Sequence, residues 1–282
     1  MAIARGGPRV THFFFADDSV LFYKASPQEW GKIQTTLELY ERASGQQLNR
    51  NKTTLLFNKN TPQTVKDSLV NKVGVTPTNC FEKYLGLPSM VGKSIMASFA
   101  SIKGRIWDKI NGWKEKFLSH VGKEVFMKAV LQAIPTYTMS VFKLPKTLCQ
   151  GINYLFSKFW WGHQNNGSKI TWLKWSNMGL AKQREGLGYR DLELFNMALL
   201  AKQGWRIMQN EESLVAQVLK KKYFSKKSFL SSRLGSNPSY VWKSIRGAKS
   251  LVQVGMIWRV RDGNSIKIWG DKWIESSYSG MI

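Results

Sequence analysis

The sequence is poor in acidic residues and contains no long apolar run. Its 282 residues include 18 Asp and Glu against 42 Lys and Arg, so the formal net charge is +24. A globular chain with so much self-repulsion normally lies against an anionic partner, and phosphate polymers are the commonest such partner. No stretch approaches the roughly 18 uncharged apolar residues that a transmembrane helix needs. The composition therefore argues against a membrane-spanning protein and predicts a polyanionic partner.

Cysteine and histidine are also scarce. The two cysteines are Cys80 and Cys149, and the three histidines, at positions 12, 120 and 163, are scattered. This excludes a disulfide framework, and a zinc site built from Cys and His is not expected. The first ten residues are too short and too polar for a secretory signal. We therefore expect an intracellular protein in the nucleus or the cytoplasm, and a location in an organelle is not excluded.

The positive charge is unevenly distributed. Residues 101–150 contain nine basic and three acidic residues, and residues 201–250 contain eleven and two, whereas the first fifty residues are nearly neutral with six and five. This distribution favours chemistry near the start of the chain and polyanion binding further along. An alternative remains open, in which the basic residues only coat solvated helix faces.

Hydrophobic periodicity predicts a mixture of short strands and helices. Strands are expected within 10–23 and at 53–58, and a hairpin at 257–269 around Asp262 and Gly263. Apolar residues recur every three or four positions in 95–118, which is typical of one buried helix face. The complete set of expected helices is 27–43, 62–73, 95–118, 123–133, 146–160, 191–209, 212–222 and 239–250. These elements predict an α+β fold.

The most informative stretch is an acidic pair between two aromatic runs. Asp17 and Asp18 are flanked on both sides by strand-forming residues, which predicts a hairpin with two carboxylates at its tip. Adjacent like charges are unfavourable unless a cation neutralises them, and hard oxygen ligands select Mg²⁺ or Mn²⁺. Such a site suits phosphoryl transfer. The alternative is an ordinary exposed turn, where Asp is common.

The acidic pair belongs to a series of motifs that resembles one family. Phe15-Ala16-Asp17-Asp18 followed by Ser19-Val20-Leu21-Phe22 resembles the catalytic palm motif of reverse transcriptases, specifically the non-LTR retroelement polymerases of plants. Segments similar to this family follow in the same order at 44–49 with Lys52, 83–88, 130–137, 159–162, 186–192, 199–203, 235–240 and 258–263. The resemblance covers essentially the whole chain.

The resemblance implies roles for individual residues. Asp17 and Asp18 would be two of the three metal-binding carboxylates of the polymerase, with Mg²⁺ or Mn²⁺ as the cofactor of the intact enzyme. Lys52 would protonate the departing pyrophosphate or steady the triphosphate. The primer grip would be formed by the turn that contains Tyr84, Leu85 and Gly86. A solvated loop lysine and a purely structural turn remain open as alternatives for these last two features.

The resemblance also implies which parts of a polymerase are missing. The third carboxylate comes from an earlier palm strand, and this sequence begins too late to contain it. The fingers and the N-terminal endonuclease of such elements are likewise absent from it. Because the two-ion geometry then lacks a carboxylate, we expect no polymerase activity from the isolated chain. The missing N-terminal polymerase portion is a possible partner.

The expected organisation is an incomplete polymerase palm followed by a mainly α-helical thumb and connecting region. The boundaries are 1–92 for the partial palm with its primer-grip turn, 93–145 for the helical thumb, and 146–282 for the mostly helical connecting region that ends in a β-hairpin. In the family the thumb lies along the template-primer duplex. No zinc is expected, because the family's zinc-binding segment lies beyond this chain.

Two basic clusters are the expected nucleic-acid surface. They consist of Lys103, Arg105, Lys109, Lys114 and Lys116 in the 95–118 helix, and of Lys220, Lys221, Lys222, Lys226 and Lys227 further along. Tyr223 and Phe224 are possible stacking partners in the second cluster. Most tryptophans are expected in the core, including those at 160, 161, 172 and 175.

The sequence therefore predicts part of a retroelement RNA-directed DNA polymerase that binds an RNA template and a DNA primer and is inactive alone. Two alternatives remain open. One is a non-catalytic nucleic-acid-binding module, which rests on the two basic clusters. The other is an unstable pseudogene relic, since half a palm sheet would leave a strand edge and aromatic residues such as those at 13–15 exposed.

Overall fold

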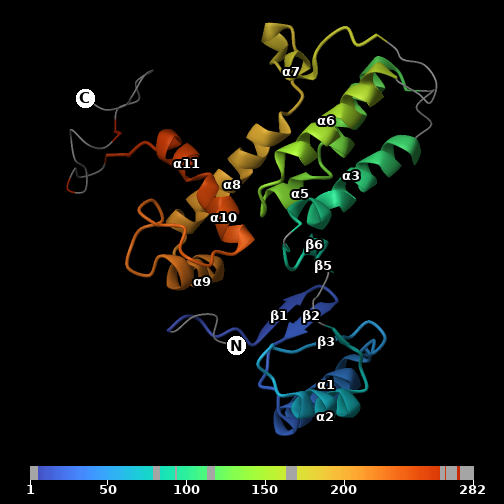
Figure 1. The fold of residues 1–282 in the computed structure, drawn as a ribbon, viewed down its shortest axis with the longest axis vertical. Helices are drawn as coiled ribbons and strands as arrows, with labels where there is room; N and C mark the ends of the chain where they lie inside the picture. Colours follow the sequence, from blue (N-terminus) through green and yellow to red (C-terminus); the bar gives the residue numbers. More distant parts are fainter. Residues whose placement is uncertain are drawn as a thin grey trace. The chain divides into compact units, whose positions relative to one another are not determined.

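The computed structural model describes residues 6–78, 83–92, 94–112, 118–162, 170–260, 264 and 272–273. The chain divides into two compact units, Met1–Lys93 and Ser94–Ile282 (Figure 1). Within the described ranges, the first unit contains three two-stranded sheets and two helices, and the second is helical. The fold is thus mixed and mainly helical, compatible with the expected α+β class. The finer division into palm, thumb and connecting region stays a prediction.

The chain's first sheet is the hairpin predicted around the acidic pair. Strand β1 (His12–Phe15) pairs antiparallel with β2 (Asp18–Leu21), and Phe15 lies opposite Asp18. Ala16 and Asp17 therefore form the turn, and Ala16 adopts a left-handed conformation with φ 51°. The structure confirms a hairpin with both carboxylates at its tip.

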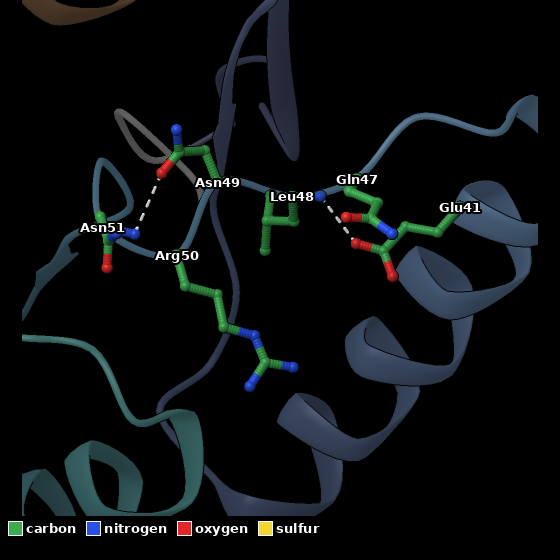
Figure 2. A pocket seen from close by; sticks show the side chains of 6 residues that line it. All are labelled: Glu41, Gln47, Leu48, Asn49, Arg50 and Asn51. Carbon is green, nitrogen blue, oxygen red and sulfur yellow. Dashed lines mark hydrogen bonds between the residues drawn. The ribbon is translucent and has the colours of Figure 1, made fainter.

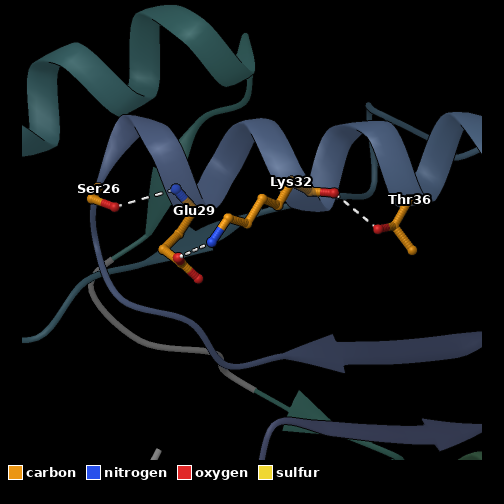
Figure 3. A network of polar contacts seen from close by, with 4 residues as sticks. All are labelled: Ser26, Glu29, Lys32 and Thr36. Carbon is orange, nitrogen blue, oxygen red and sulfur yellow. Dashed lines mark hydrogen bonds and ion pairs between the residues drawn. The ribbon is translucent and has the colours of Figure 1, made fainter.

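Helix α1 (Pro27–Ser44) confirms the helix expected at 27–43. The side chain of Ser26 accepts a hydrogen bond from the backbone N–H of Glu29, and Gly45 ends the helix at φ 72°. Figure 3 shows this cap with an ion pair of 3.0 Å between Lys32 and Glu29 and a hydrogen bond of 2.9 Å from the Thr36 hydroxyl to the Lys32 carbonyl. The cap satisfies one backbone donor that the first helical turn leaves free.

A parallel strand pair completes the core of the first unit. β3 (Leu55–Leu56) pairs with β4 (Pro77–Thr78), and α2 (Gln63–Val73) connects them. Parallel neighbours need such a crossover. The sequence predicted β3 and α2 but not β4. The buried side chains here include Leu69, Val73 and Val75.

The second unit begins with α3 (Ile95–Gly112), which packs against α6 (Lys146–Trp161). The two helices run side by side in Figure 1. The buried face of α3 consists of Phe99, Ile102, Ile106 and Ile110, which confirms the predicted apolar stripe. The rest of the predicted helix, at 113–117, lies outside the described residues.

The expected helix at 123–133 is not regular. Helix α4 (His120–Phe126) continues into a π-helical turn, η2 (Met127–Leu131), in which the N–H of Gln132 donates to the carbonyl of Met127. A short helix, α5 (Thr136–Met139), follows. A π turn inserts an extra residue and so shifts the helical register, which a 3.6-residue period does not reveal.

The remaining helices of the second unit follow α6 along the chain. They are α7 (Trp175–Met178), η3 (Lys182–Arg184), α8 (Leu192–Gln209), α9 (Leu214–Tyr223), α10 (Tyr240–Gly247) and α11 (Lys249–Gly255). The side chains of Asp191, Ser213 and Ser239 cap the first turns of α8, α9 and α10. The bounds of α8 and α9 confirm the helices predicted at 191–209 and 212–222. The helix predicted at 239–250 is instead two helices, because Ala248 leaves the helical conformation between them. The hairpin predicted at 257–269 lies largely outside the described residues.

The core between α8, α9 and α10 is centred on Trp242, which is fully buried. Tyr223 stacks on its indole ring at 5.0 Å, and Phe224 at 5.4 Å. The expectation that most tryptophans lie in the core is wrong for the described residues: Trp160, Trp161 and Trp175 are half-buried, and Trp172 is 76% exposed. Across the described part of the chain, no helix combines the length and apolarity that a bilayer crossing requires.

Candidate nucleic-acid interface

Asp17 and Asp18 lie on the hairpin tip with both side chains exposed. Among the described residues, no group of three or more His, Cys, Asp or Glu side chains comes together that could hold a metal ion. Two adjacent carboxylates supply only part of the oxygen ligand set that Mg²⁺ or Mn²⁺ requires. These residues therefore do not by themselves fit a complete two-ion site.

Lys52 is positioned by a turn around Asn49. The side-chain oxygen of Asn49 accepts hydrogen bonds from the backbone N–H groups of Asn51 and Lys52, at 3.1 and 3.2 Å. An open hollow of about 540 Å³ lies beside this turn, lined by Glu41, Gln47, Leu48, Asn49, Arg50 and Asn51 (Figure 2). No hydrogen bond or ion pair between described residues joins Lys52 to either aspartate. Its role in pyrophosphate departure stays a prediction.

The candidate primer grip is a tight hairpin turn. β5 (Lys83–Tyr84) pairs antiparallel with β6 (Leu87–Pro88), which leaves Leu85 and Gly86 as the two turn residues. Both have positive φ, 50° and 76°, as a type I′ turn requires. A leucine in this conformation costs roughly 1–2 kcal/mol. The structure confirms the turn, and the primer-grip role of Tyr84, Leu85 and Gly86 stays a prediction.

The described members of the first basic cluster lie on the exposed surface of α3. Lys103, Arg105 and Lys109 are all exposed, with Lys103 on one flank of the buried stripe and Arg105 and Lys109 on the other. Lys114 and Lys116 lie outside the described residues. None of the ion pairs between described side chains involves these three cations. Their charge is therefore available to an external anion.

The second basic cluster follows α9 into the next loop. Lys221, Lys222, Lys226 and Lys227 are exposed. Lys220 is half-buried and forms an ion pair with Glu211, so its charge is partly compensated. No hydrogen bond or ion pair between described residues connects this cluster to the cations of α3.

The sequence predicted that Tyr223 and Phe224 could stack on bases beside the second cluster, and the structure corrects this expectation. Phe224 is buried against Trp242 and Phe229, so a base cannot stack on it. Tyr223 is packed on Trp242, and its hydroxyl accepts a hydrogen bond from the backbone N–H of Ser239 at 3.0 Å. Phe224 is thus a core residue, and Tyr223 is half-buried with its ring stacked on Trp242, although their neighbours in the sequence are lysines.

A third group of cations, which the sequence did not single out, surrounds Glu124. Lys128 and Lys182 both pair with this carboxylate, at 2.7 and 3.4 Å. The hydrogen bond from Lys128 holds the pKa of Glu124 below its usual value. Lys128 also lies over the ring of Tyr189, whose pKa is raised by burial and then by the Glu124 carboxylate. Because these cations already have a carboxylate, they are weaker candidates for phosphate contact than those of α3.

The sequence also did not single out the exposed aromatic residues Trp107 on α3 and Tyr154 on α6, nor Lys158, which lies over the Tyr154 ring at 5.7 Å from its centre. For Trp107 and Tyr154, the only sequence signal is that each aromatic residue lies between apolar core positions of its helix. That position identifies them as exposed only once the packing of the two helices is known.

Comparison with known proteins finds relatives from a plant. No family model matches it. It is similar to at least two proteins of Arabidopsis thaliana. One, named "Putative ribonuclease H protein At1g65750", is 35% identical over 180 residues, which are 63% of this chain but only 29% of that protein. The other, named "Uncharacterized mitochondrial protein AtMg00310", is 39% identical over 143 residues, which are 50% of this chain and 93% of that protein. Because nearly the whole of this relative is matched at that identity, the chain belongs to the family of the uncharacterized mitochondrial protein AtMg00310.

Proposed function

We propose that the chain is a nucleic-acid-binding part of a plant retroelement reverse transcriptase, and that it holds the RNA template and DNA primer without polymerising alone. The observation that carries the proposal is the set of three exposed cations on α3, at positions 103, 105 and 109, which have no carboxylate partner among the described residues. The name of one relative, a ribonuclease H protein, also points to a nucleic-acid partner.

The finer assignments follow the same proposal. Asp17 and Asp18 would contribute two carboxylates to a metal site of the intact enzyme, and a bound Mg²⁺ or Mn²⁺ would supply charge stabilisation there. Lys52 and the turn at 84–86 would contact the triphosphate and the primer. Among the described residues no third carboxylate joins this pair in a group that could hold a metal ion, so polymerisation would require a further polymerase portion.

Binding to a short RNA–DNA hybrid is expected to weaken steeply as salt rises. Each phosphate contact that releases counterions contributes about −0.9 to the slope of log K against log salt in duplex DNA. Replacing Lys103, Arg105 and Lys109 together by alanine should make this slope shallower by about two to three. Fluorescence polarisation of a labelled hybrid across a KCl series measures both the affinity and the slope.

The matched control removes the same charge from cations that already have partners. Lys32, Lys146 and Lys182 are exposed and pair with Glu29, Glu193 and Glu124. Their triple alanine variant should keep most of the salt slope. An affinity insensitive to salt, or an equal loss in both triple variants, would contradict a binding surface on α3.

Primer extension separates binding from catalysis. The purified chain, given oligo(dT) annealed to poly(rA) with Mg²⁺ or Mn²⁺, is expected to incorporate no more nucleotide than a variant with Asp17→Asn and Asp18→Asn. The reason is the incomplete carboxylate set at the hairpin tip. Incorporation above that variant would show that the chain polymerises alone and would overturn this part of the proposal.

A further inference from the structure

Two long-range contacts fix how α3 and α6 lie against each other. The Thr147 hydroxyl at the start of α6 donates to the sulfur of Met96 at the start of α3, at 3.3 Å. Further along, the Lys103 side chain lies across Gly151: a Cβ added to this glycine would be 3.5 Å from the Lys103 Nζ. The two helices therefore run in the same direction with a defined register.

This register aligns one row of side chains from each helix. On α3 the row contains Met96, Ala100, Lys103 and Trp107, and on α6 it contains Thr147, Gly151, Tyr154 and Lys158. Residues three, four and seven apart share a helix face. Since each residue rises about 1.5 Å, Trp107 and Tyr154 lie at nearly the same height beyond the contact between Lys103 and Gly151. The two rows therefore form one face, which we call the α3–α6 face.

The α3–α6 face combines exposed aromatic rings with cations. Trp107 is 44% exposed and Tyr154 is 61% exposed. The ammonium group of Lys158 lies 5.7 Å from the centre of the Tyr154 ring. The eight positions of the two rows include two lysines and no carboxylate. The face thus offers two flat apolar surfaces in a positive field.

Unpaired nucleic acid matches this chemistry better than a duplex. Bases that are not paired can stack on exposed aromatic side chains while lysines contact the backbone phosphates. A duplex buries its base faces in its own stack and presents phosphates outward. Adjacent helix axes are about 8–10 Å apart, so rings on two helices would receive two separate bases.

We propose that the α3–α6 face binds an unpaired nucleic-acid strand, with bases stacked on Trp107 and Tyr154 and phosphates on Lys103 and Lys158. The inference rests on the proposed nucleic-acid-binding function and specifies that the ligand at this part of the surface is a single strand and not a duplex. Arg105 and Lys109 lie outside the two rows, on another side of α3.

Fluorescence polarisation with a labelled oligo(dT) strand and with an RNA–DNA hybrid of equal length tests the inference. The Trp107→Ala and Tyr154→Ala substitutions should each raise the Kd for the single strand about tenfold, because stacking on an aromatic ring is worth about 1–3 kcal/mol per base. The Kd for the hybrid should change less than about twofold. The salt slope should stay unchanged in both variants, and Lys103→Ala should make it shallower.

A matched variant and a conservative one serve as controls. Trp205 on α8 is 41% exposed, close to Trp107, but lies outside the two rows. The Trp205→Ala variant should bind the single strand like the parent, and Trp107→Phe should retain most of the affinity. Circular dichroism establishes that each variant keeps its helix content.

The outcomes separate this inference from the proposed function. If the parent chain binds both ligands and the double variant of Trp107 and Tyr154 binds the single strand as tightly, the inference is wrong and the proposed function stands. An equal loss for strand and hybrid, or an equal loss in Trp205→Ala, overturns the inference in the same way. If the parent binds neither ligand at low salt, the proposed function fails and the inference fails with it.

Discussion

Replacing Asn196 by leucine is expected to lower the free energy of unfolding by about 3 kcal/mol or more. Asn196 is 2% exposed on α8 and makes three hydrogen bonds to the end of α5 and the segment that connects it to α6. Its amide group donates to the carbonyls of Met139 and Phe142, at 2.7 and 2.9 Å, and its carbonyl accepts from the N–H of Leu144, at 2.8 Å. Leucine has a similar size but leaves three buried backbone groups without these partners.

The same connecting segment is held from a second side, which explains why Asn196 matters for the surface. The Tyr240 hydroxyl of α10 donates to the carbonyl of Lys143, and the N–H of Lys143 donates to the Ser244 hydroxyl, at 2.6 and 2.9 Å. This segment leads directly into α6. Loss of the Asn196 contacts should therefore loosen the start of α6 and, with it, the α3–α6 face.

Urea denaturation followed by tryptophan fluorescence measures this effect. Eleven of the twelve tryptophans lie between residues 107 and 273, so the signal reports mainly on the second unit. Asn111→Leu, at an exposed position of α3, is the control and should change stability by less than about 0.5 kcal/mol. A loss below about 1 kcal/mol for Asn196→Leu would mean that water or a rearranged loop replaces the three hydrogen bonds.

Local sequence signals predicted most helices and the acidic hairpin. Helix α1 begins after Ser26 and ends before Gly45, two residues that favour helix ends for known steric and hydrogen-bonding reasons. The turn at Ala16 and Asp17 lies between strand-forming runs that pair with each other directly. In these cases the interactions that decide the structure connect residues close in sequence.

The features that were missed depend on contacts between distant residues. β4 exists because Pro77 pairs with Leu55, 22 positions earlier. The burial of Phe224 depends on Trp242 and Phe229. The alignment of Trp107 with Tyr154 follows from contacts between α3 and α6 that are 48 and 51 residues apart in sequence. Charge and periodicity could predict the exposed cations of α3 but not which aromatic residues lie beside Lys103.

The second unit contains a loop that only glycine can form. Between η3 and α8 the chain doubles back, and the N–H groups of Gly186 and Gly188 donate to the carbonyls of Ala181 and Leu180, at 3.2 and 2.8 Å. A Cβ at position 186 would lie 2.0 Å from the carbonyl oxygen of Leu180. This distance is far shorter than a van der Waals contact, and both groups belong to backbone that hydrogen bonds hold in place.

The Gly186→Ala substitution is therefore expected to lower the free energy of unfolding by about 3 kcal/mol or more. The loop must open to admit the methyl group, which breaks the Gly188–Leu180 hydrogen bond and displaces Tyr189 from its stacked contact with Trp175 at 5.1 Å. Gly104→Ala is the control, because nothing lies within 4 Å of its added Cβ on α3; there, higher helix propensity should raise stability by up to about 1 kcal/mol. Urea denaturation of both variants distinguishes the clash from a general effect of losing glycine. A Gly186→Ala protein within about 1 kcal/mol of the parent would mean that Leu180 moves aside at little cost, and that the loop does not fix the position of Tyr189.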